Sequence, residues 1–127
     1  MASSLPLVLL LCILGTAFSD LRVSNLRAAG LRPDQNSNAD GFVKVFCAST
    51  SMGQTTVYHD HPNPSWTSTF TYRRALQGDV LKLEVFDKDV AFDDRLGTCT
   101  VRIKKGTFSH RCSLTKGGTL SYTYSLN

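Results

Sequence analysis

Apolar and polar residues alternate along several short segments of the chain. In segment 80–86, Leu81, Leu83 and Val85 fall on one face, while Lys82 and Glu84 fall on the other. Segment 119–126 repeats the pattern, with leucine or tyrosine at every second position. Because successive side chains of a strand point to opposite faces, a period of two predicts strands with one buried face.

The whole chain divides into eight such segments and contains no helical stretch of any length. The predicted strands span residues 21–26, 42–48, 54–58, 66–72, 80–86, 98–103, 109–114 and 119–126. Glycines at 53, 78, 106, 117 and 118 mark turns between them. This arrangement predicts an all-β fold, an eight-stranded antiparallel β-sandwich.

The first nineteen residues have the pattern of a secretory signal peptide. An apolar run over residues 5–14 is followed by Ala17, Phe18 and Ser19, which suit a cleavage site between Ser19 and Asp20. The alternative, a membrane anchor, is disfavoured because the run is too short to span a bilayer. We therefore expect a signal peptide at 1–19, a single domain at 20–127, and a secreted, extracellular protein.

Cysteine usage and charge fit that location. Cys12 would leave with the signal peptide, and three cysteines remain. Cys99 and Cys112 flank a short glycine-containing connection and are predicted to form a disulfide, as an oxidising compartment allows. Cys47 shares a strand face with two valines and is expected to be a buried free thiol, with an intermolecular bridge as the alternative. The formal net charge of +4 favours anionic surfaces without naming a partner.

Acidic residues gather in two connections of this otherwise basic chain. Asp34 and Asp40 flank the first, and the second reads Asp87-Lys88-Asp89-Val90-Ala91-Phe92-Asp93-Asp94. Loops that leave the same end of a sandwich converge, and like charges brought together there favour a bound cation. Carboxylate oxygens without thiolates favour calcium. The alternative is that aspartate simply occurs often in turns.

Val90, Ala91 and Phe92 place an apolar triplet at the tip of the second acidic connection. Such a tip would gain free energy by entering a membrane interface, unless Phe92 folds back onto the base of the loop. His59 and His61 could bind zinc, but their spacing more readily fits a solvated loop. The sequence contains no nucleophile arrangement and no phosphate-binding glycine loop, so we expect no enzymatic activity.

Several motifs together resemble the C2 domain family. They are Leu21-Arg22-Val23-Ser24-Asn25-Leu26 with Asp40-Gly41-Phe42-Val43-Lys44-Val45, then Asn63-Pro64-Ser65-Trp66, and then the second acidic connection through Asp94-Arg95-Leu96-Gly97. The resemblance covers nearly the whole segment 20–127. Within the family, the loop length and the cysteine-bearing strands are most similar to the C-terminal C2 domain of perforins, although we expect this protein to lack their pore-forming domain.

This resemblance implies a type II C2 sandwich that docks on phospholipid in the presence of calcium. It implies metal ligands at Asp34, Asp40, Asp87, Asp89 and Asp94, with Asp93 competing for the last place. Phe92 and Val90 match membrane-entering positions, whereas Arg32 and Gln35 replace aromatic residues of the first loop. We expect a secreted, calcium-dependent membrane-binding module, in immune defence by analogy with perforins. The alternative is a calcium-stabilised protein–protein module. We expect a monomer that binds neither nucleic acid nor a small-molecule substrate.

Overall fold

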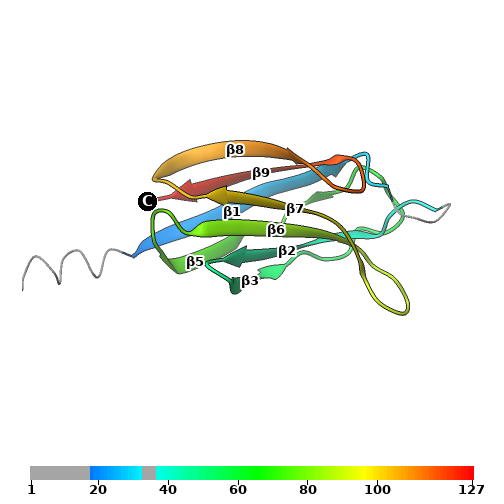
Figure 1. Ribbon diagram of the computed structural model, residues 1–127, viewed down its shortest axis with the longest axis horizontal. Helices are drawn as coiled ribbons and strands as arrows, with labels where there is room; N and C mark the ends of the chain where they lie inside the picture. The colour runs from blue at the N-terminus through cyan, green and yellow to red at the C-terminus, as the bar shows by residue number, and fades with distance from the viewer. Residues whose placement is uncertain (1–17, 33–36) are drawn as a thin grey trace, which may run out of the picture.

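The computed structural model describes residues 18–32 and 37–127 as two packed antiparallel sheets. In the first sheet, β1 (Ser19–Ala29) lies between β9 (Thr119–Leu126) on one side and β4 (Ser65–Trp66) and β5 (Phe70–Ala75) on the other, and β8 (Gly106–Ser113) borders β9. The second sheet has the order β3 (Thr50–Gln54), β2 (Gly41–Cys47), β6 (Val80–Asp87), β7 (Asp94–Arg102). The predicted all-β antiparallel sandwich is confirmed (Figure 1).

The core lies between the sheets and is built from the period-two positions of the sequence. Leu81, Leu83 and Val85 of β6 are fully buried, as are Val43 and Val45 of the neighbouring β2. Their polar neighbours along each strand face outward and are only partly buried. Alternation therefore decided which face of each central strand packs against the other sheet.

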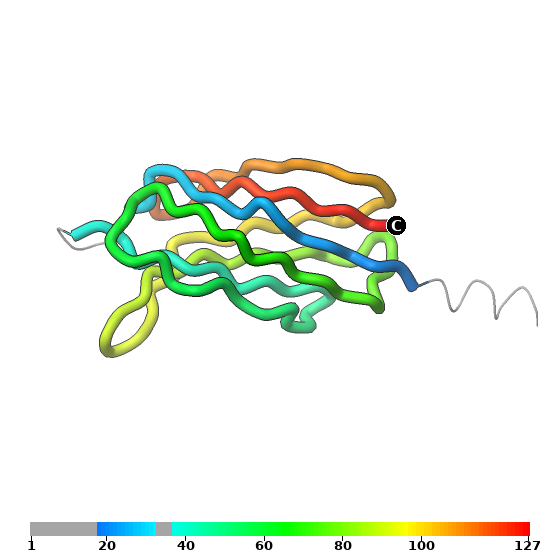
Figure 2. The backbone as a smooth tube through the Cα atoms, turned by 180° about the vertical axis from the view of Figure 1, so that it is seen from behind, coloured from blue at the N-terminus to red at the C-terminus, as the bar shows by residue number. Residues whose placement is uncertain are grey.

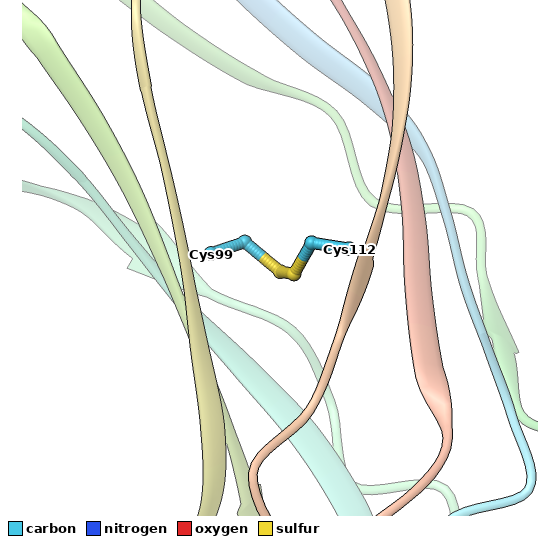
Figure 3. Close-up of a disulfide and its surroundings, with 2 residues drawn as sticks. All are labelled: Cys99 and Cys112. Carbon is cyan, nitrogen blue, oxygen red and sulfur yellow. A yellow bond between two sulfur atoms is a disulfide. The ribbon is translucent and has the colours of Figure 1, made fainter.

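The two sheets are joined by the disulfide predicted between Cys99 and Cys112. Cys99 belongs to β7 and Cys112 to β8, so the bond crosses from one sheet to the other (Figure 3). The two Cα atoms lie 6.0 Å apart, an ordinary separation for a disulfide. The third cysteine, Cys47, is a fully buried free thiol. Burial, and secondarily the charge of Asp79, raises the pKa of Cys47 to about 11.

The prediction of a strand at 54–58 was wrong in position. The strand that forms a hairpin with β2 is β3, which shares only Gln54 with the predicted segment. Further along that segment, Tyr58 forms an isolated bridge to Gly41. Cys47 pairs with Thr50, so the hairpin turn consists of Ala48 and Ser49, which both have positive φ. Two-residue hairpins favour this geometry, but usually with Asn-Gly or Asp-Gly, so the Ala-Ser pair gave no turn signal.

The predicted strand 66–72 is divided into β4 and β5, which gives nine strands where eight were expected. Both pieces pair with β1, and they are interrupted where β1 carries a bulge. Asn25, with φ of 55°, is the residue in the left-handed conformation at this bulge. A bulge interrupts the regular ladder and bends its strand, which accounts for the break in the partner.

The ends of the sandwich differ in what they carry. The beginning of β1 and the C-terminus lie at one end, where the backbone N–H of Asn127 donates to the carbonyl of Asp20. The β1–β2 and β6–β7 connections lie at the other end, and the β6–β7 loop projects beyond the body of the sandwich (Figures 1 and 2). The acidic connections are therefore together, as predicted.

Candidate functional site

The candidate site is the end of the sandwich where β2 begins and β6 ends. The backbone N–H of Lys88 donates to the carbonyl of Asp40 at 2.8 Å, and the N–H of Asp40 donates to Oδ1 of Asp87 at 2.8 Å. These two bonds hold the end of the first acidic connection against the start of the second. Asp40 and Asp87, 47 positions apart in sequence, are thus brought into contact.

Asp87 is the residue on which the acidic cluster centres. Burial raises the pKa of Asp87 above its ordinary value; the hydrogen bond from the backbone of Asp40 opposes that shift, and the charges of Asp40, Asp94 and Asp89 add to it. Four carboxylates are therefore close enough to repel one another in their charged forms. A cation placed among them would relieve this repulsion, which is the electrostatic condition for a metal site.

Asp93 and Asp94, the two acidic residues at the end of the β6–β7 loop, differ in their contacts. Asp94 is the first residue of β7 and stands directly opposite Asp87 in the β6–β7 pairing. Its two carboxylate oxygens accept from Nζ of Lys116 at 3.0 and 2.8 Å. Asp93 instead accepts from the backbone N–H of Asp89 at 3.3 Å and lies 3.5 Å from Nζ of Lys88. The register therefore puts Asp94, rather than Asp93, beside Asp87.

The loop between β3 and β4 contributes backbone and histidine contacts to the same end. The N–H of Asp60 donates to Oδ1 of Asp40 at 2.7 Å, and Nδ1 of His59 lies 3.7 Å from the same oxygen. His61 has a different partner, since its Nδ1 accepts from the backbone N–H of Asn63 at 3.0 Å. The two histidines thus have different partners, and nothing in their contacts supports a shared zinc ion.

Lys116 is the residue of this site that sequence reasoning missed. It lies in the β8–β9 connection, and its ammonium offsets the charge of Asp94. Its position in the sequence could have pointed to it, because Lys116 precedes Gly117 and Gly118 in a turn that lies at the same end of the sandwich as the acidic loops. Lys116 therefore balances part of the negative charge of the cluster.

The donor set suits calcium in its chemistry, although no metal-holding arrangement stands preformed in the described residues. Within residues 18–32 and 37–127, no group of three or more histidines, cysteines or carboxylates is placed to hold a metal ion. Three carboxylate oxygens accept no hydrogen bond from any described residue and so remain available to coordinate a cation; they are Oδ2 of Asp40, Asp87 and Asp89. Asp34, the remaining expected ligand, lies outside the described residues.

The tip of the β6–β7 loop is apolar and fully accessible. Val90 is 104 % exposed and Phe92 is 79 % exposed, and Ala91 between them is exposed as well. The alternative that Phe92 folds back onto the loop is therefore not what the structure shows. Large apolar side chains held in water at a projecting tip cost free energy unless a partner covers them.

Fold and sequence together identify the protein's class. A sequence model described as "C2 domain" matches residues 19–121. The chain belongs to the C2 domain family.

Individual relatives sharpen this assignment. Human perforin-1 is 34 % identical over 102 residues, which is 78 % of this chain and 18 % of perforin-1. A solved structure of a C2 domain superposes with a TM-score of 0.84 at 49 % identity, covering 86 % of this chain and 98 % of that domain. The C2A domain of a plant extended synaptotagmin 1 gives a TM-score of 0.75 at 26 % identity, covering 86 % and 94 %. The chain spans about a fifth of the perforin it matches.

The described residues include no helix of the length and apolar character needed to cross a membrane.

Proposed function

We propose that this chain is a secreted, calcium-dependent module that binds phospholipid membranes. The observation that carries the proposal is that three of the clustered carboxylates and the exposed apolar tip share one loop, within the span from Asp87 to Asp94. Calcium and phospholipid binding are common among C2 domains, which supports the proposal.

Each part of the loop has a separate task in this proposal. Asp40, Asp87, Asp89 and Asp94, together with Asp34, would hold the calcium. Bound calcium would neutralise these carboxylates and offer open coordination positions to lipid phosphate oxygens. The contacts between Asp40 and Asp87 fix the loop base, so the tip is presented beyond the sandwich body. Val90, Ala91 and Phe92 then leave water for the membrane interface.

Secretion is part of the same proposal. It is supported by the signal-peptide pattern of residues 1–19, of which 1–17 lie outside the described residues, and by the disulfide. Segment 20–127 would then be a single extracellular C2 domain, acting as a monomer on membranes. Similarity to perforin-1 supports immune defence as its setting.

Vesicle sedimentation with calcium and with chelator tests the proposal. Wild type is expected to pellet with phospholipid vesicles in calcium alone, and the double variant D87N/D89N is expected to stay in the supernatant in both conditions. The matched control, D20N/E84Q, removes the same charge on strands, so it should pellet as wild type does. Vesicle binding by D87N/D89N at wild-type levels would refute the metal-dependent mechanism.

The same experiment separates the rival function, a calcium-stabilised protein–protein module. In that case calcium would raise the unfolding temperature of wild type, while no vesicle composition would cause it to pellet. Calcium that neither stabilises the protein nor promotes vesicle binding would refute both functions.

A further inference from the structure

The outer face of the first sheet carries an open polar groove whose lining, unlike the acidic loops, contains no carboxylate. The groove has a volume of about 700 Å³ and crosses β4, β1, β9 and β8. Its size falls within the range of ordinary ligand sites, about 300–1,000 Å³. The bulge at Asn25 contributes to it, because the β1–β9 register shifts between Ser24 and Arg27 and the sheet bends there.

Two arginines flank a serine across the groove. Arg27 of β1 pairs with Ser121 of β9, and Ser121 pairs in turn with Arg111 of β8. Both arginines are exposed and line the groove. Their backbones stand two strand spacings apart, about 10 Å, so they suit a ligand with at least two anionic groups rather than one.

Among the described residues, no carboxylate balances these two arginines. Within residues 18–32 and 37–127, neither Arg27 nor Arg111 forms an ion pair with a carboxylate. The strands of this sheet carry five arginines and only one acidic residue, Asp20. Each guanidinium group without a carboxylate partner favours an oxyanion, which it can bind through two parallel hydrogen bonds.

The rest of the lining is mainly polar and is rich in hydroxyl and amide groups. Its polar residues besides the two arginines are Asn25, Ser65, Ser109, His110, Ser121, Tyr122 and Thr123, and Leu26 completes the lining with Trp66. Ser109 and Thr123 already hydrogen-bond at 2.9 Å, which orders this part of the surface. Trp66 borders the groove, but it is only 5 % exposed and belongs to the core, so its buried indole N–H is not presented to a ligand. The exposed hydroxyl and amide groups of the lining are suited to the hydroxyls of a sugar.

The exposed apolar residues lie elsewhere. The large hydrophobic side chains that are exposed in the described residues include Leu76, Val90 and Phe92, and none of them lines the groove. A membrane-docking face would be expected to carry such residues, so a soluble polyanion fits better than a lipid surface. From these observations we propose that the groove binds a sulfated glycan chain, with Arg27 and Arg111 each holding one sulfate group. This choice of polyanion rests on the proposed secretion.

Heparin binding in the presence of chelator tests this proposal separately from calcium-dependent function. Wild type is expected to bind heparin, and R27Q/R111Q is expected to bind it at least about tenfold more weakly, since each lost bond to a charged group is substantial. The matched control R73Q/R74Q removes two arginines of β5 outside the groove and should weaken binding by less than about threefold. Desulfated heparin should bind wild type poorly.

Four results would overturn the proposal. The first three are no heparin binding by wild type, equal weakening of heparin binding in R27Q/R111Q and R73Q/R74Q, and equally strong binding of heparin and desulfated heparin by wild type. The fourth is that R27Q/R111Q loses binding to anionic vesicles but still binds heparin as wild type does. The last would assign the groove to a lipid headgroup. If R27Q/R111Q does not fold, S121E places a carboxylate between the arginines and should weaken heparin binding equally. Wild type that pellets with vesicles in calcium yet ignores heparin would leave the proposed function standing and remove only the glycan site.

Discussion

Replacing Phe92 with alanine should weaken membrane binding without affecting calcium binding or folding. Fully burying a phenylalanine side chain contributes about 1.5–3 kcal/mol relative to water. Phe92 is 79 % exposed, so that fraction of its surface can be transferred to lipid, a contribution of about 1.2–2.4 kcal/mol. The vesicle partition coefficient in calcium should therefore fall about 7- to 60-fold.

The matched control for this measurement is L76A. Leu76 is also exposed, at 41 %, but it lies in the β5–β6 turn at the opposite end of the sandwich. The variant should partition as wild type does. Because Phe92 lies outside the packed core, F92A should also keep the unfolding free energy within about 0.5 kcal/mol of wild type.

Two outcomes would refute the reasoning about the loop tip. If F92A and L76A partition equally, the tip does not enter the membrane. If F92A loses calcium affinity, measured by titration without vesicles, as strongly as it loses lipid affinity, then Phe92 shapes the loop instead of contacting lipid.

Three further predictions concern stability and are checked by denaturant unfolding. Serine at both Cys99 and Cys112 should cost about 3 kcal/mol in the chain-entropy model, and an unchanged midpoint after reduction would contradict this. Thr55→Val should cost about 1–3 kcal/mol, because the hydroxyl oxygen of Thr55, a residue only 3 % exposed, accepts from the Val43 N–H at 2.9 Å; Thr55→Ser should cost less. Burial raises the pKa of Cys47 to about 11 in the folded protein, so the protonated thiol contributes fully to the free energy of unfolding below the unfolded-state pKa, and this contribution is lost as pH rises from about 9 to 11. Cys47→Ala should therefore lose less stability than wild type over this alkaline range. An identical loss of stability in both proteins would refute the reasoning.

The sequence alone determined the fold class, the faces of the central strands and the disulfide. Alternation of Leu81, Leu83 and Val85 with polar residues sufficed because burial on one face of a strand is a local pattern with a fixed period. The Cys99–Cys112 pair was predictable because few cysteines remained and the connection was short. The clustering of acidic loops followed from the geometry of any sandwich.

Only the tertiary structure decided which residues of those loops and sheets stand together. Asp94 rather than Asp93 faces Asp87 because of the β6–β7 register, which depends on pairing across the sheet and not on either segment alone. The row of Arg27, Ser121 and Arg111 likewise exists only because three strands distant in sequence lie side by side around a bulge. Register is a long-range property, set when whole faces pack, so local sequence carries little information about it.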